Sequence, residues 1–142
     1  MRPRRHKSSF DIWAHAMKPT HFLIASTLWF AASLAQALTI APYSAAALEA
    51  AQKADAPVAL HFHAPWCPTC KAQSKTLNDL KSDAALDITV LTVDYDLEVE
   101  LRKQLKVRSQ STLIVYRGAV ERARLAGETQ AEPLKAALQA AL

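Results

Sequence analysis

A short apolar run that ends at a pair of cysteines constrains the fold of this chain more than any other feature. Residues 58–63 read Val-Ala-Leu-His-Phe-His and are predicted to form a buried strand. A helix is predicted from Cys67 to about Lys81, with Pro68 acceptable in its first turn. Cys67 and Cys70 are the only cysteines of the chain. The sequence therefore places both of them where a strand gives way to a helix.

This position favours reactive cysteines. Backbone N–H groups without partners and the positive end of the helix dipole face a cysteine at a helix N-terminus, and both favour the thiolate over the thiol. A second cysteine three positions later can attack a mixed disulfide from the same turn. The alternative is a structural disulfide, but a bridge that closes so short a loop constrains the unfolded chain little. We therefore interpret Cys67 and Cys70 as a redox-active pair.

The rest of the chain alternates between predicted helices and strands. The expected elements are a helix from its cap at Ser44 to about Ala54, a strand over 88–93, a helix marked by Leu97, Leu101 and Leu105, strands over 112–116 and 119–125 that flank a turn at Arg117-Gly118, and a last helix from a capping box at Thr129–Glu132 to near Leu142. Strand–helix–strand units with short loops imply parallel pairing, and the hairpin adds an antiparallel edge. The expected fold class is an α/β sandwich with one mixed sheet and helices on both faces.

The first 37 residues are typical of a secretory signal peptide. They hold five basic groups against one acidic group, an apolar run over 22–35, and the cleavage pattern Ala35-Gln36-Ala37. A true start at Met17 would give this signal a conventional length. The alternative is an uncleaved N-terminal membrane anchor, although the run is short for a span of about 20 residues. We expect an exported, periplasmic protein whose folded domain covers residues 38–142.

Charge excludes one class of partner. Residues 38–142 contain 12 basic and 12 acidic side chains, so the basic character of the whole chain belongs to the leader. No basic stripe crosses the remainder, and we therefore predict no binding to nucleic acid. An acidic cluster of Asp94, Asp96, Glu98 and Glu100 is interpreted as a solvated face.

From about Ser44 to Leu142, the chain resembles a small exported protein of the thioredoxin family. The likeness rests on the motif Ala64-Pro-Trp-Cys-Pro-Thr-Cys-Lys71 directly after a strand, on Val93-Asp-Tyr-Asp96, and on the segment from Val107 to Gly118. The resemblance implies a thioredoxin-like three-layer sandwich. It also implies a thiol–disulfide oxidoreductase, and the lack of a helical insertion favours a protein-disulfide reductase over an oxidant.

The resemblance also implies roles and partners. Cys67 would be the exposed nucleophile and Cys70 the buried resolving thiol, with no cofactor beyond their disulfide. The substrates would be disulfide-bearing proteins, the electron donor a membrane-embedded thiol shuttle, and the protein a monomer. The side chains expected to form the substrate-binding rim are Trp66, Pro68, Thr69, Ser111 and Thr112.

Two departures from the family pattern concern this same site. His61 stands where thioredoxins usually carry a buried aspartate, and it could accept the proton of Cys70 or be a buried core histidine. Ser111 stands where the family usually has a cis-proline, so the Gln110–Ser111 bond is expected to be trans.

A different class of function also fits the residue types. His61, His63, Cys67 and Cys70 lie within ten residues, and these side chains are possible ligands of zinc or Cu(I). A non-catalytic metal-binding or metal-delivery module is therefore the alternative hypothesis, and it requires the four side chains to converge on one point.

Overall fold

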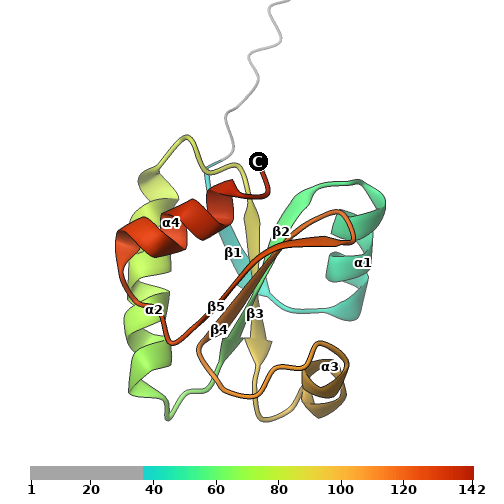
Figure 1. Cartoon of the computed structure of the whole chain (residues 1–142), viewed down its shortest axis with the longest axis vertical. Helices are drawn as coiled ribbons and strands as arrows, with labels where there is room; N and C mark the ends of the chain where they lie inside the picture. The colour runs from blue at the N-terminus through green and yellow to red at the C-terminus, as the bar shows by residue number, and fades with distance from the viewer. Residues whose placement is uncertain (1–36) are drawn as a thin grey trace, which may run out of the picture. The chain divides into compact units, whose positions relative to one another are not determined.

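A mixed sheet of five strands forms the centre of the fold in the computed structural model, which describes residues 37–142 (Figure 1). The elements are β1 (Thr39–Pro42), α1 (Ala45–Lys53), β2 (Pro57–His63), α2 (Pro68–Asp79), the 3₁₀ turn η1 (Leu80–Ser82), β3 (Thr89–Asp94), α3 (Val99–Gln104), β4 (Thr112–Arg117), β5 (Val120–Ala126) and α4 (Ala131–Gln139). The strand order is β1-β3-β2-β4-β5. The pairs β1–β3 and β2–β3 are parallel, whereas β2–β4 and β4–β5 are antiparallel. The predicted α/β fold with a mixed sheet is confirmed.

Two helices cover each face of the sheet, as Figure 1 shows. Side chains alternate between the two faces of a strand, so Ala59 and His61 of β2 share one face, while Leu60 and Phe62 share the other. Ala59 belongs to an apolar cluster with Leu77 of α2 and with α4. Leu60 and Phe62 belong to a second cluster, against α1 and α3. His61 therefore lies on the sheet face that α2 covers.

The sequence did not predict β1. This strand has only four residues, and it adds a parallel edge to the sheet by pairing with β3 from Thr39↔Thr89 to Pro42↔Thr92. Leu38, directly before it, is only 3% exposed and joins the apolar cluster beneath α2 and α4. Nothing local distinguishes this short segment as a strand, because its stability comes from β3, some fifty residues later in the chain.

Helix ends were predicted with mixed success. Ser44 caps α1 as expected, since its hydroxyl accepts a hydrogen bond from the N–H of Ala47 (3.1 Å). The capping box at Thr129 is wrong, because α4 begins after Gln130 and the carboxylate of Glu128 accepts the N–H groups of Thr129 and Gln130 instead. Leu97 is 78% exposed and precedes α3 rather than belonging to its apolar side.

The predicted leader lies outside the described residues, apart from Ala37 at its end. The signal peptide, the alternative start at Met17 and the membrane anchor are therefore still predictions. Within residues 37–142, the helices are all too short or too polar to cross a membrane.

Candidate active site

The two cysteines lie at the start of α2, just beyond the end of β2, and they form a disulfide. Cys67 is the N-cap residue of α2, with extended backbone angles, and Pro68 follows at the first helical position. The Cys67 sulfur accepts a hydrogen bond from the backbone N–H of Cys70 at 3.0 Å. The sulfur therefore occupies the place where a helix offers N–H groups to an anion, as the sequence predicted.

Cys67 is less exposed than the sequence analysis expected. It is 2% exposed and Cys70 is 0% exposed, so the expectation of a freely exposed nucleophile needs correction for the disulfide form. Cys67 nevertheless lines a surface cavity of about 250 Å³. The other lining residues are Thr69, Ser109, Gln110, Ser111, Ala126 and Gly127. Because Cys70 is absent from this lining, a partner that enters the cavity meets Cys67 first.

Trp66 lies at the rim of the site and is 58% exposed, and Pro68 and Thr69 are also exposed. The indole Nε1–H of Trp66 donates a hydrogen bond of 2.7 Å to Asp96 Oδ2, in the segment that follows β3. Asp96 therefore orients an exposed aromatic ring beside the cysteines. The sequence predicted only a solvated face for Asp96, because its partner Trp66 is 30 residues away in the chain.

Ser111 has an unusual backbone. Its φ is +64°, in the left-handed region that side-chain-bearing residues rarely adopt, and no peptide bond is cis among residues 37–142. The expectation of a trans Gln110–Ser111 bond is thus confirmed. The N–H of Ser111 donates to Phe62 O at 2.8 Å, and its carbonyl accepts from Gly127 N at 3.0 Å. These two bonds hold the loop against β2 on one side and against the end of β5 on the other.

Thr112 is placed differently from the other predicted rim residues. It is 4% exposed, and its hydroxyl donates to the carbonyl of Ser109 at 2.7 Å. Thr112 does not line the cavity beside Cys67. Its hydroxyl stabilises the loop of residues 109–111 instead of contacting a ligand in the cavity.

Gln73 is a buried polar residue that the sequence analysis did not single out. It lies three positions after Cys70, on the same inward face of α2, and is 0% exposed. Its Nε2 donates to Glu128 O at 2.7 Å, and its Oε1 accepts from the Ser111 hydroxyl at 3.4 Å. The one feature of the sequence that could have indicated this role is a glutamine on the apolar side of a predicted helix. Gln73 connects the cysteine helix to the loop that carries Ser111.

His61 is buried on the same side of the sheet and is 1% exposed. Burial above all, together with the nearby His63 ring, lowers the pKa of its imidazole to about 4, and the side-chain amide of Gln73 partly opposes this shift. Among the described residues, no hydrogen-bond partner meets its Nε2 atom. His61 is therefore a neutral ring at pH 7, with one polar ring nitrogen unsatisfied.

The four residues of the metal hypothesis are not assembled as a ligand set. The rings of His61 and His63 lie edge to face with their centroids 5.6 Å apart, and the two sulfurs are joined to each other. Across residues 37–142, no group of three or more histidine, cysteine or acidic side chains is arranged to hold a metal ion. The geometry does not support the metal-binding alternative.

Comparison with known proteins gives the family of this site. The family model described as Thioredoxin matches residues 40–140. The chain belongs to the thioredoxin family. The match includes every site residue described above and extends over most of the sheet and helices.

Individual thioredoxins share the fold of this chain but only about a third to two fifths of its residues in the aligned regions. A thioredoxin of Mycobacterium tuberculosis is 32% identical over 71 residues, which are 50% of this chain and 61% of that protein. A thioredoxin of Alicyclobacillus acidocaldarius is 31% identical over 84 residues, 59% of this chain and 80% of its own length. The crystal structure of Trxlp from Edwardsiella tarda is 40% identical, with a TM-score of 0.67, and the alignment covers 70% of this chain and 98% of that one. The chain thus spans about three fifths of the length of the thioredoxins of Mycobacterium bovis and Mycobacterium tuberculosis that it matches.

Proposed function

We propose that this thioredoxin-family chain is a thiol–disulfide oxidoreductase that works as a protein-disulfide reductase. The observation that carries the proposal is the Cys67–Cys70 disulfide at the start of α2, with Cys67 lining a surface cavity and Cys70 buried behind it. Such a pair can alternate between a dithiol and a disulfide without any other cofactor.

The reaction follows from this asymmetry. In the reduced protein, the Cys67 thiolate attacks one sulfur of a substrate disulfide, that S–S bond breaks, and the other substrate sulfur leaves as a thiolate. The product is a mixed disulfide between Cys67 and the substrate. The Cys70 thiolate then attacks the Cys67 sulfur, restores the Cys67–Cys70 disulfide and releases the second substrate thiol. The substrate gains two electrons, and the protein loses two.

His61 is proposed to accept the proton of Cys70 in the second step. The ring lies on the sheet face beneath α2, it contacts Gln73, which is one turn from Cys70, and its Nε2 has no partner among the described residues. A neutral ring can accept a proton, and the negative charge of the Cys70 thiolate would favour the imidazolium. Gln73 is proposed to be a positioning residue that holds the ring and the Ser111 loop together.

Replacing His61 by leucine is expected to change two pH dependences. The histidine pKa falls from 6.5 to about 4 on folding, so the unfolded chain binds this proton more readily. Acid therefore destabilises the wild type between about pH 6.5 and pH 4, by up to about 3 kcal/mol over the whole interval. Urea unfolding at each pH should show that His61→Leu loses this dependence. The pH profile of substrate reduction should shift in the same variant if His61 accepts the proton.

His63→Gln is the matched control, because it removes a histidine from the same strand face and keeps His61. This control should retain most of the acid sensitivity. An unchanged stability profile in His61→Leu would contradict the low pKa, and an unchanged rate profile would contradict the role in proton transfer.

The partners and location are also proposals. We propose that the substrates are disulfide-bearing proteins, that the chain acts as a monomer, and that a membrane-embedded thiol shuttle supplies its electrons. The basic, apolar and Ala-x-Ala segments of residues 1–37 support export to the periplasm and removal of this leader, which leaves a thioredoxin-like domain of residues 38–142.

Two measurements test the proposed activity. The purified protein is expected to accelerate the reduction of insulin by dithiothreitol. In equilibrium with glutathione, its potential is expected to lie nearer about −270 mV than about −120 mV, because the first value is typical of a reductant and the second of an oxidant. A protein that leaves the insulin rate unchanged is not a disulfide reductase, and a potential near the higher value would reverse the proposed direction.

A further inference from the structure

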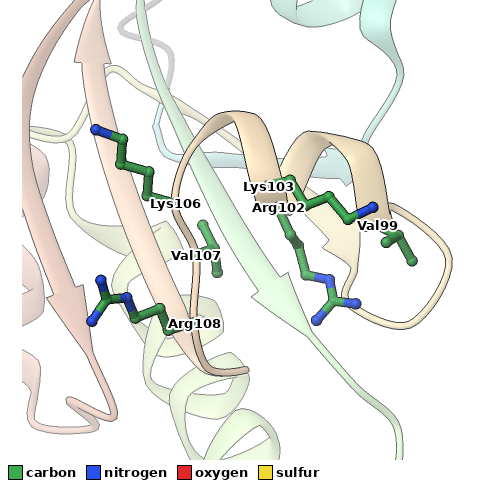
Figure 2. A pocket seen from close by; sticks show the side chains of 6 residues that line it. All are labelled: Val99, Arg102, Lys103, Lys106, Val107 and Arg108. Atoms are coloured by element: carbon green, nitrogen blue, oxygen red, sulfur yellow. The ribbon is translucent and has the colours of Figure 1, made fainter.

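A second cavity, beside the site, has a strongly basic lining. It measures about 440 Å³ and lies along α3 and the segment that leads to β4 (Figure 2). Four of its lining residues are cationic, none is acidic, and the others are Val99 and Val107. We call it the basic cavity, and its cations are Arg102, Lys103, Lys106 and Arg108. The equal numbers of basic and acidic side chains in residues 38–142 conceal this local basic cluster.

Most of these cations have no ionic partner among the described residues. Only Lys103 is paired, with Glu100 at 2.8 Å, and it remains largely exposed. The Arg102 guanidinium lies over the Tyr95 ring at 3.9 Å from the ring centroid, and its buried Nε has no hydrogen-bond partner in the described part of the chain. Arg102 is therefore held in place by an aromatic ring and still has an unsatisfied donor.

The arrangement of the charges indicates the shape of the ligand. In Figure 2 the side chains of Arg102 and Lys103 extend from α3 to one side, whereas those of Lys106 and Arg108 extend to the other side. The charged ends do not converge on one point, so a compact anion such as phosphate could contact only some of them. An extended segment with several carboxylates could contact them all.

The basic cavity and the cavity beside Cys67 are lined by consecutive parts of one segment, which end at Arg108 in the first and begin at Ser109 in the second. Tyr95 packs against the cluster of Ala64, Cys67 and Cys70, and its hydroxyl donates to the carbonyl of Arg108 at 3.3 Å. The chain then runs from Arg108 directly into residues 109–111, which line the Cys67 cavity. A polypeptide with its disulfide at Cys67 can therefore extend along this segment towards the cations.

We propose that the basic cavity binds an acidic segment of the protein whose disulfide Cys67 attacks. This inference rests on the proposed function and adds a substrate class, namely disulfides flanked by aspartate or glutamate. The preference for acidic substrates would come from the basic cavity and not from the charge of the whole domain, because residues 38–142 carry 12 basic and 12 acidic groups and so have no net charge. Charges at a rim mainly raise the rate of association with a partner of opposite charge.

Three synthetic peptides test the proposal. Each carries one cysteine as a mixed disulfide with thionitrobenzoate, flanked by aspartate and glutamate, by asparagine and glutamine, or by lysine. The Cys67 thiolate attacks the peptide sulfur, and the release of thionitrobenzoate is followed by its absorbance. At low ionic strength the acidic peptide is expected to react at least about tenfold faster than the amide peptide, and added salt should reduce this ratio.

The matched variants separate the cavity from overall charge. Arg102→Gln/Lys106→Gln/Arg108→Gln should bring the acidic and amide peptides to within about twofold of each other and leave the amide rate unchanged. Lys53→Gln/Lys81→Gln/Arg122→Gln removes as many charges from exposed positions elsewhere and should keep the preference. If loss of the Arg102–Tyr95 contact impairs folding, Lys106→Gln/Arg108→Gln should still reduce the preference.

Each result has a defined meaning. Equal rates for the acidic and amide peptides in the wild type, or equal losses in the two triple variants, would overturn the proposal and leave the oxidoreductase activity intact. Absence of thionitrobenzoate release from every peptide would instead refute the proposed function. Binding to phosphatidylglycerol vesicles that depends on the same cations, without a peptide preference, would assign the cavity to membranes and also overturn the proposal.

Discussion

Cys67→Ser is expected to abolish disulfide reduction, whereas Cys70→Ser is expected to stop the reaction at a mixed disulfide. A serine hydroxyl is not ionised at neutral pH, so the first variant has no nucleophile in the cavity. The second variant keeps the nucleophile but must wait for an external thiol to resolve the intermediate. An intramolecular thiol has a very high effective concentration, so the turnover should fall by at least about 10³-fold.

The insulin assay measures the loss, and mass spectrometry detects the adduct after the reduced protein has reacted with insulin in the absence of dithiothreitol. Cys70→Ser should accumulate one substrate chain per protein, and dithiothreitol should release it. The double variant Cys67→Ser/Cys70→Ser is the control and should form no adduct. If Cys67→Ser accumulates the adduct instead, the buried cysteine is the nucleophile and the assignment from the cavity lining is reversed.

Ser111→Pro, which introduces the residue usual in the family, is expected to destabilise this protein by about 3 kcal/mol or more. Proline holds φ near about −65°, whereas Ser111 has a φ of +64°. The substitution also removes the N–H that donates to Phe62 O at 2.8 Å. Urea unfolding of the oxidised protein measures the change in the free energy of unfolding.

Ser111→Gly is the matched control for this loop. Glycine adopts positive φ without strain, which offsets its larger entropy loss on folding, so the free energy of unfolding should change by about 1 kcal/mol or less. A stable Ser111→Pro variant, or a Ser111→Gly variant that is destabilised as much as Ser111→Pro, would contradict the left-handed backbone at Ser111.

Features with a local cause were predictable from the sequence. The strand of residues 58–63, the cysteine at the start of a helix and the serine cap of α1 each depend on neighbouring residues, and each is found in the structure. Alternation along the strand also predicts that His61 and His63 share a face, whereas the helix that covers this face is not determined by the strand pattern.

Features that depend on distant partners were not predictable in the same way. β1 exists because β3 offers it a parallel edge, and Asp96 matters because Trp66 reaches it from another loop. The capping box at Thr129 failed because α4 begins one residue later and the Glu128 carboxylate accepts the Thr129 N–H that the box assigned to Glu132. Gln73 is a polar residue at a position where the helix pattern predicts an apolar core side chain. Its part in the site is evident only from its hydrogen bonds with Ser111 and Glu128.

The burial of Leu38 bears on the order of events during maturation. The proposed cleavage site is the peptide bond between Ala37 and Leu38, and Leu38 is already packed into the core beside β1. The next residue, Thr39, is held by a hydrogen bond from its N–H to Ile88 O at 3.0 Å. A peptidase needs an extended, accessible chain at the bond that it cuts. If the leader is cut at this bond, the cut has to come before β1 docks against β3, so that processing precedes completion of the sheet edge.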